Sequence, residues 1–289
     1  MNQMLKHKAV APATHIGSAR SRNLLTSDQS YPSHAIVAEW LKHPRPNHFL
    51  IHFSSRFNFS SMNDLLSHHL FGTYLDQDWH MQPCERVALI YILQLLNPAL
   101  SIEIGTFKGG SLRPISRYSE KVISFDVDPN QHRFAPLFAN TDFVTGDTAL
   151  VLPDIIQNIN NDPSSELSFI LIDGSHESDG VKSDIENCLQ YVPKTKPCYI
   201  LMHDSSNPDV RRGIQESNWV SCPYLHAVNV DYVPGQLYSR QDIQDQVWGG
   251  LGLALMLPEK RIGSIQLQAH FAYSLQAFDD FVSSKRILA

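Results

Sequence analysis

The chain has 289 residues, of which 43% are hydrophobic and 18% are charged, a balance typical of a globular protein with a sizeable buried core. Its formal net charge of -6 argues against a nucleic acid or an anionic membrane surface as the main partner, because both require clustered positive charge. The four cysteines form no CxxC pair, and their small number favours a reducing, cytoplasmic location. The longest apolar run, residues 87–96, is too short to span a bilayer.

Residues 1–78 are expected to form an N-terminal arm followed by a helical segment, and residues 79–289 a separate domain. The arm is polar and rich in small residues, whereas residues 31–78 show only short and irregular helical patterns. A second irregular segment, residues 234–248, is too long for a tight turn. Long segments of this kind often form lids, so we expect both to lie over the site and to select the substrate.

A regular spacing of apolar residues begins after Trp79. Pro83 suits the first turn of a helix with apolar residues at helical spacing, and Asn97-Pro98 ends it. Apolar strand segments then alternate with helical segments, which predicts an open, mostly parallel α/β sheet. Strands are expected at residues 101–105, 122–126, 142–145, 168–173, 198–203, 224–233 and 249–257, followed by a short strand at 264–269 and a final helix.

Residues that could bind a ligand or take part in a reaction lie at the predicted strand ends. Ligands of open α/β sheets bind beyond the carboxyl ends of the strands. The sequence therefore predicts one site at this edge, formed by five residues that end or follow four strands: Gly105, Asp126, Asp173, His203 and Asp204.

The first predicted strand runs into a glycine-rich turn. Gly105 lets the backbone turn tightly and approach a ligand, and Gly109 opens the next helix, whose free N–H groups point at a bound molecule. About twenty residues further on, Asp126 can accept hydrogen bonds from both hydroxyls of a ribose. Phe107 stands at the middle glycine of the dinucleotide fingerprint and would crowd a pyrophosphate. S-adenosylmethionine, which carries no phosphate, therefore fits better than a dinucleotide, although a structural turn without a ligand is the simpler alternative.

Asp147 follows the third predicted strand, within Gly146-Asp147-Thr148. Its carboxylate could contact the adenine edge of the cofactor. It could equally cap the next helix, because aspartate is a preferred capping residue. The sequence leaves both roles open.

A second cluster is predicted from neighbouring strands. Asp173 and Asp204 should converge at one rim, and paired carboxylates suit a Mg²⁺ ion that keeps several waters. Beside them, His203 would favour zinc, iron, nickel or copper, since imidazole prefers these metals. Three interpretations remain open: His203 points away from a Mg²⁺ site, the metal is a different one, or no metal binds.

His176 is the candidate general base. It lies three residues beyond Asp173, and the usual histidine pKa near 6.5 suits proton transfer at neutral pH. The chain contains 14 histidines, and a histidine beside an aspartate is often only a surface or capping group. Its position at the predicted site favours the catalytic role.

Residues 103–111, 171–176 and 202–204 together resemble class I S-adenosylmethionine-dependent methyltransferases. The most similar branch includes the macrocin-type sugar O-methyltransferases and the cephalosporin hydroxylase-like proteins, and the resemblance runs from about Trp79 to Leu257. It implies a Rossmann-like sheet of about seven strands, the last antiparallel, with helices on both faces. The cofactor residues expected from the resemblance and from the turn are Glu103, Gly105, Thr106, Gly109, Ser111, Asp126 and Asp147.

The resemblance also implies a reaction. In relatives the aspartate at the position of Asp173 and an acidic pair after the next strand bind the metal, and a histidine at the position of His176 acts as base. We therefore expect a metal-assisted O-methyltransferase acting on a hydroxyl of a sugar or natural product, with Asp173 and His176 as catalytic residues and Asp173, His203 and Asp204 as ligands of a divalent metal, Mg²⁺ first. The alternatives are an oxidative enzyme on the same fold, for which iron would suit His203, and a cofactor-binding protein without turnover. The family also suggests a homo-oligomer.

Overall fold

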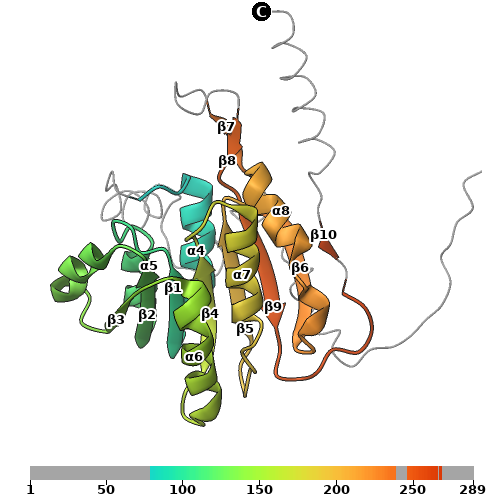
Figure 1. The fold of residues 1–289 in the computed structure, drawn as a ribbon, viewed down its shortest axis with the longest axis horizontal. Helices are drawn as coiled ribbons and strands as arrows, with labels where there is room; N and C mark the ends of the chain where they lie inside the picture. The colour runs from blue at the N-terminus through green and yellow to red at the C-terminus, as the bar shows by residue number, and fades with distance from the viewer. Residues whose placement is uncertain (1–78, 239–245, 266, 269–289) are drawn as a thin grey trace, which may run out of the picture. The chain divides into compact units, whose positions relative to one another are not determined.

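An eight-stranded sheet lies at the centre of the computed structural model, which describes residues 79–238, 246–265 and 267–268 (Figure 1). The strand order is β10-β6-β9-β5-β4-β1-β2-β3. Neighbouring strands are parallel except at β9, which runs antiparallel to both β5 and β6. The strands are β1 Leu100–Ile104, β2 Lys121–Asp126, β3 Thr141–Thr145, β4 Leu167–Ile172, β5 Cys198–His203, β6 Leu225–Val233, β9 Leu251–Met256 and β10 Leu267–Gln268.

This arrangement confirms the predicted fold class, an open and mostly parallel α/β sheet of Rossmann-like type. All seven main strands lie where the sequence predicts them, to within two residues at each end, and the predicted strand at 264–269 is the short β10. The antiparallel strand β9 lies between β5 and β6 and not at the edge. One boundary was wrong: the strand predicted from residue 249 begins at Leu251, because Gly249 and Gly250 have φ values of +75° and +84° and turn the chain.

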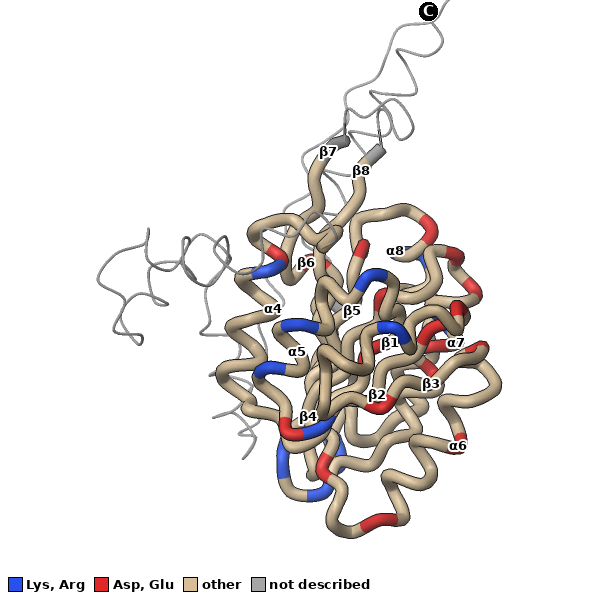
Figure 2. Tube along the Cα trace, turned by 90° about the vertical axis from the view of Figure 1, so that its left-hand side faces the viewer, with Lys and Arg blue, Asp and Glu red and all other residues tan. Residues whose placement is uncertain are grey.

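Helices cover both faces of the sheet (Figure 2). One layer contains α4 and α5, and the other contains α6, α7 and α8. Because both faces are covered, every residue of β1, β4 and β9 is buried. The helices are α4 Pro83–Leu96, α5 Leu112–Tyr118, α6 Thr148–Asn161, α7 Ser178–Cys188 and α8 Pro208–Glu216, with 3-10 turns η2 Pro129–Leu137 and η3 Trp219–Ser221.

The start of α4 is fixed by its own sequence. Pro83 occupies the first turn, and Gln82 and Glu85 form a capping box in which the Gln82 backbone N–H donates to Glu85 Oε2 at 2.6 Å. At the other end, Asn97 takes a left-handed conformation and its N–H donates to the Leu93 carbonyl oxygen. These caps hold the helix and fix the position of Glu85 at its first turn.

Part of the predicted lid is described. Within residues 234–248, β7 (Gln236–Tyr238) and β8 (Gln246–Trp248) pair as an antiparallel ribbon. The predicted arm and helical segment, residues 1–78, and the predicted final helix lie outside the described residues. None of the helices within the described ranges is long and apolar enough to cross a membrane.

Candidate active site

A cavity of about 1050 Å³ opens at the carboxyl ends of the central strands. Its wall includes Gly105 after β1, Asp126 at the end of β2, Asp173 after β4 and His203 at the end of β5. The chain order reverses between β1 and β4, which is the point where open α/β sheets bind ligands. Pockets for one small ligand are roughly 300–1,000 Å³, so this cavity lies at the upper end of that range.

The turn after β1 forms one end of the cavity. Gly105 has a φ of +96°, and a Cβ atom on it would lie 2.1 Å from the backbone oxygen of Asp173. Only glycine therefore allows the end of β1 to approach the end of β4 so closely. The backbone N–H groups of Gly105 and Thr106 both donate to the Phe125 carbonyl oxygen, at 2.9 and 3.1 Å, which ties the turn to β2.

Asp126 lies beside this turn, as predicted for a ribose-binding carboxylate. Its Oδ2 accepts a hydrogen bond from the Phe107 N–H at 2.7 Å, and its Oδ1 accepts one from the Asp128 N–H at 2.9 Å. These contacts fix the carboxylate at the cavity wall. The structure thus brings together the glycine turn and the acidic end of β2.

Glu103 lies beneath the turn and does not line the cavity. It is fully buried and accepts hydrogen bonds from the Ser111 and Ser124 hydroxyls, both at 2.6 Å. Burial raises the pKa of Glu103 to about 8, although both serine hydrogen bonds act in the opposite direction. Glu103 supports the turn from below, and Gly109 is likewise absent from the wall, whereas Gly105, Thr106, Ser111, Asp126 and Asp147 line it.

Asp147 begins α6. Its Oδ1 accepts a hydrogen bond from the Ala149 N–H at 2.9 Å, so the capping role that the sequence left open is confirmed. The residue also lines the cavity, and its contact with adenine stays a prediction.

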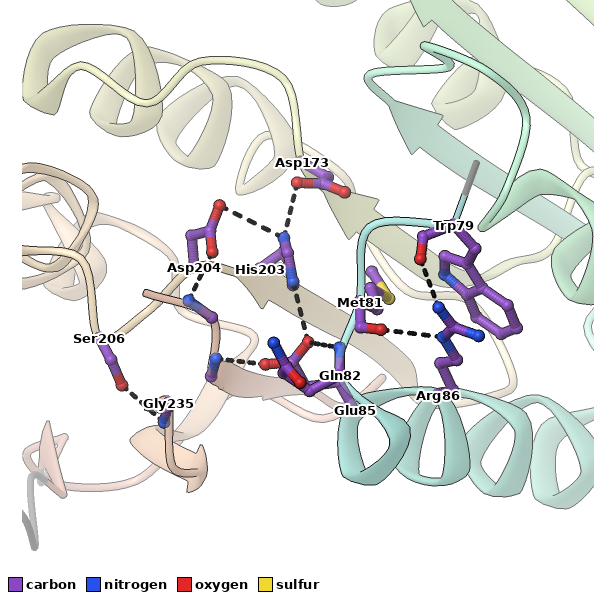
Figure 3. A network of polar contacts seen from close by, with 12 residues as sticks. Trp79, Met81, Gln82, Glu85, Arg86, Asp173, His203, Asp204, Ser206 and Gly235 are labelled. Carbon is purple, nitrogen blue, oxygen red and sulfur yellow. Dashed lines mark hydrogen bonds and ion pairs between the residues drawn. The ribbon is translucent and has the colours of Figure 1, made fainter. Parts of the chain in front are cut away.

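His203 forms the centre of a polar cluster at the other end of the cavity (Figure 3). Its Nδ1 lies 2.9 Å from Asp173 Oδ1 and 3.5 Å from Asp204 Oδ2. Its Nε2 lies 3.1 Å from Glu85 Oε2. The ring therefore faces both aspartates, and the interpretation in which His203 points away from them is wrong.

Glu85 is the residue that sequence reasoning missed. It is fully buried, and its Oε1 accepts a hydrogen bond from the Gly250 N–H at 2.5 Å, while Oε2 faces both Gln82 N–H and His203. The only signal for it in the sequence is the capping box, which predicts the start of a helix and not a site. Its partners His203 and Gly250 lie 118 and 165 residues further along the chain.

His176 is joined to the cluster through Asp204. Its Nε2 lies 2.9 Å from Asp204 Oδ2, and the Gly249 N–H donates to Asp204 Oδ1 at 2.7 Å. The imidazole also packs against Trp248, with ring centroids 5.6 Å apart, and 48% of its side chain is exposed. The glycine turn before β9 thus holds both Asp204 and Glu85.

The charged groups of the cluster shift one another's pKa values. The hydrogen bond to Asp204 raises the pKa of His176 above its usual value. Burial alone would lower the pKa of His203, but the charges of Asp173 and Asp204 outweigh it and raise that pKa well above its usual value. Burial would raise the pKa of Asp204, but the two histidines and the Gly249 N–H lower it instead.

The donor set fits a divalent metal. Asp173, His203 and Asp204 each offer one ligand atom, and these atoms lie within 4.8 Å of one another. Glu85 at the other ring nitrogen is the kind of carboxylate partner that orients a histidine ligand. One imidazole with two carboxylates suits zinc or iron better than magnesium, which prefers oxygen ligands alone.

The part of the chain that forms most of this site matches a known protein family. Residues 102–205 match the family model described as a methyltransferase domain. This part of the chain is therefore similar to a methyltransferase domain. The matched range contains the glycine turn, Asp126, Asp173, His176 and the His203-Asp204 pair. Comparison with the curated proteins gives no match.

Several solved structures are similar to the chain. The O-methyltransferase from Bacillus cereus in complex with S-adenosylhomocysteine shares 16% identity and a TM-score of 0.44, over 68% of this chain and 91% of that one. The O-methyltransferase TomG from Streptomyces achromogenes shares 13% identity and a TM-score of 0.44, over 72% and 96%. CalS11, a TDP-rhamnose 3'-O-methyltransferase, shares 14% identity and a TM-score of 0.41, over 81% and 98%. The fold assignment rests on the strand order and not on these similarities.

Proposed function

We propose that this protein is an S-adenosylmethionine-dependent O-methyltransferase that acts on a hydroxyl group of a small sugar or natural product, with assistance from a divalent metal. One observation carries the proposal: a single cavity joins a carboxylate placed to bind a ribose, Asp126, to an imidazole–carboxylate cluster around Asp173, His176 and Asp204. The first group suits the methyl donor and the second suits activation of an acceptor. The family match describes methyl transfer, so it gives no support to the oxidative alternative.

The charge of the cavity favours this donor over a dinucleotide. Adenosylmethionine carries a positive sulfonium, whereas a pyrophosphate is negative. Arg86 is the one arginine or lysine among the described lining residues, and its guanidinium donates to the backbone oxygens of Met81 and Trp79. The carboxylates in the wall, which would repel a pyrophosphate, are Asp126, Asp147, Asp173, Asp184 and Asp204.

His176 is the proposed base. A sugar or aliphatic hydroxyl loses its proton only far above neutral pH, so transfer needs a group that accepts the proton as the methyl group arrives. In neutral His176, the Nε2–H donates to Asp204, which leaves the lone pair on Nδ1 free to accept the proton. Asp204 then stabilises the imidazolium that forms.

Three side chains of the polar cluster would hold the proposed metal. Asp173, His203 and Asp204 would hold a divalent cation, which would lower the pKa of an acceptor hydroxyl. Glu85 would keep the Nε2–H of His203 occupied and its Nδ1 directed at the two aspartates.

Two experiments test the proposal. Isothermal titration calorimetry should show binding of adenosylmethionine and adenosylhomocysteine to the full chain, and failure of both to bind would overturn it. A panel of hydroxylated sugars and natural products, incubated with methyl-labelled adenosylmethionine, should then yield an O-methylated product by mass spectrometry. Transfer to nitrogen or carbon atoms only would refute the O-methyl part while leaving the donor assignment intact.

A further inference from the structure

Arg211 forms a buried ion pair outside the cavity wall, in a part of the molecule that the proposed reaction does not use. It lies in α8, and its guanidinium donates to both carboxylate oxygens of Asp231 in β6, at 2.7 and 3.1 Å. Only 10% of the Arg211 side chain and 1% of the Asp231 side chain are exposed. A buried pair of this kind is often no more stabilising than two apolar side chains in its place. Stability alone therefore does not account for the pair.

A further hydrogen bond of the guanidinium reaches the chain directly after Asp204. Nη1 of Arg211 donates to the Ser205 carbonyl oxygen at 3.3 Å. The N–H of the same peptide bond, which belongs to Ser206, donates to the Gly249 carbonyl oxygen at 3.0 Å. Because a peptide bond is planar and rigid, the guanidinium that holds its oxygen also sets the direction of its N–H.

Gly249 carries this constraint into the site. Its carbonyl oxygen accepts the hydrogen bond from Ser206, and its own N–H donates to Asp204 Oδ1 at 2.7 Å. Oδ2 of the same carboxylate lies 2.9 Å from His176 Nε2. A continuous series of hydrogen bonds therefore leads from Arg211 to the carboxylate that contacts the proposed base.

The backbone of Asp204 makes such a constraint necessary. Its φ of +54° lies in the left-handed region, which residues other than glycine seldom adopt and which persists where surrounding contacts impose it. Two backbone hydrogen bonds hold the turn: the Asn207 N–H donates to the Asp204 carbonyl oxygen at 2.8 Å, and the Ser205 N–H donates to the Gly250 carbonyl oxygen at 3.4 Å. The bond from Arg211 fixes the next peptide, so its loss should let the turn relax.

We propose that Arg211 is a positioning residue that holds the Asp204 carboxylate against His176. It acts through the hydrogen-bonded peptide and Gly249, because it does not line the cavity itself. This inference rests on the proposed function, which gives the carboxylate and the imidazole their roles in proton transfer. Asp126 lies outside this series of hydrogen bonds, so loss of Arg211 should lower the rate of methyl transfer and leave cofactor affinity unchanged.

The main test removes both charges of the ion pair at once. Arg211→Met combined with Asp231→Leu leaves no unpaired charge, and the fold should persist, because apolar residues often replace a buried pair without loss of stability. With nothing holding the Ser205 carbonyl oxygen, the hydrogen bond from Gly249 to Asp204 should open more often. Amide hydrogen exchange followed by NMR should show the Gly249 N–H exchanging at least about tenfold faster, with exchange in β1 and β4 as in the wild type.

The same double variant has a kinetic readout. On the acceptor found in the panel, kcat should fall by about 10- to 100-fold, because a small displacement of a positioning contact is enough to misalign proton transfer. Calorimetry should show the wild-type affinity for adenosylhomocysteine. A loss of rate without a loss of cofactor affinity separates positioning of Asp204 from general damage to the cavity.

Two single variants complete the comparison. Arg211→Lys keeps a positive charge beside Asp231 but lacks the planar fork, so it should keep the ion pair and lose the weaker bond to the neutral carbonyl oxygen. It should therefore reproduce the faster exchange of the Gly249 N–H, and it provides the test if the double variant does not fold. The matched control is Arg212→Met at the next position of α8, where the ion pair with Asp209 is exposed. This control should change neither exchange nor rate.

The outcomes are distinct. Wild-type exchange at Gly249, or a full rate, in a folded variant without Arg211 would overturn the inference. An equal rise in exchange throughout the sheet would also overturn it, because the ion pair would then serve stability alone. The exchange experiment needs no cofactor. If adenosylmethionine and adenosylhomocysteine both fail to bind, the proposed function fails, and exchange of the Gly249 N–H still shows whether Arg211 holds Asp204.

Discussion

The two ends of the cavity are assembled from different parts of the chain. At the donor end, the Phe107 N–H reaches Asp126 over a separation of 19 residues, within one β-turn-α-β unit. At the acceptor end, Glu85 reaches His203 and Gly250 over 118 and 165 residues. The donor end is therefore a local unit, whereas the acceptor end exists only when the whole sheet has formed.

The two ends also differ in chemistry. The donor end offers a positive-φ turn and one carboxylate, a set suited to a ligand that needs no activation. The acceptor end concentrates Glu85, Asp173 and Asp204 around one imidazole, which is suited to moving a proton or holding a cation. Changes at the donor end should therefore alter binding of the cofactor, and changes at the acceptor end should alter the rate.

His176→Ala should separate the rate of methyl transfer from cofactor affinity more clearly than any other change. Loss of the proton acceptor should lower the rate of methyl transfer by about 10²–10⁴-fold. Affinity for adenosylhomocysteine should stay within about twofold, because the donor end is unchanged. Single-turnover kinetics and calorimetry measure the two quantities. The control is His226→Ala, because the His226 imidazole contacts the Glu259 carbonyl oxygen and does not line the cavity. This variant should change neither the rate nor the affinity. If His176→Ala keeps the full rate, His176 is not the base.

Asp126→Asn should have the reverse effect and weaken cofactor binding more than it lowers the rate. An amide cannot accept hydrogen bonds from both ribose hydroxyls as a carboxylate does, so affinity for adenosylhomocysteine should fall by about 10- to 100-fold. At saturating cofactor the rate should change by much less. The exposed Asp142→Asn, which loses only a surface ion pair with Lys121, is the matched control. Unchanged affinity in Asp126→Asn would show that the ribose binds elsewhere.

The contrast between the two ends also explains what the sequence could reveal. Strand periodicity predicted the sheet, and the glycine turn with Asp126 predicted the donor end, because each signal lies within a short stretch of chain. Asp173, His203 and Asp204 were predicted to meet because parallel strands end at one edge. Glu85 could not be predicted, since its contacts depend on how α4 packs against residues more than a hundred positions away.

The role of glycine residues shows the same limit. Gly105 was predicted from its place after a buried strand. Gly249 and Gly250 were assigned to a strand, because two glycines before an apolar run do not indicate which groups they approach. In the structure they form a turn whose N–H groups bind Asp204 and Glu85. That function is set by tertiary contacts and leaves no local pattern.

Glu85→Gln tests whether the buried carboxylate acts through His203. The amide keeps the shape but loses the charge, so the orientation of the ring should loosen and the rate should fall about tenfold, with adenosylhomocysteine affinity unchanged. The free energy of unfolding should fall by about 1–3 kcal/mol, measured by urea denaturation, because buried N–H groups lose a charged acceptor. Glu120→Gln, at an exposed position before β2, is the control. A drop in cofactor affinity as large as the drop in rate would mean that Glu85 supports the whole cavity and not the acceptor end alone.

The smallest expected effect is a displacement of the pH–rate profile. His176 must be neutral to accept a proton, so the rate should rise with pH through the pKa of this histidine. The hydrogen bond to Asp204 raises that pKa, which places the rising limb above pH 6.5. In Asp204→Asn the partner is neutral and the cause of the increase is removed, so the limb should move to lower pH even though the maximal rate is reduced. The profile of kcat/KM, measured on the acceptor found in the panel, gives the position of the limb in both proteins.

The donor end provides the internal comparison. Asp126 lies outside the imidazole–carboxylate cluster, so Asp126→Asn should lower kcat/KM at every pH without moving the limb. If both variants move the limb equally, the titration belongs to a group other than His176, and the division of the cavity into a binding end and a proton-transfer end is wrong.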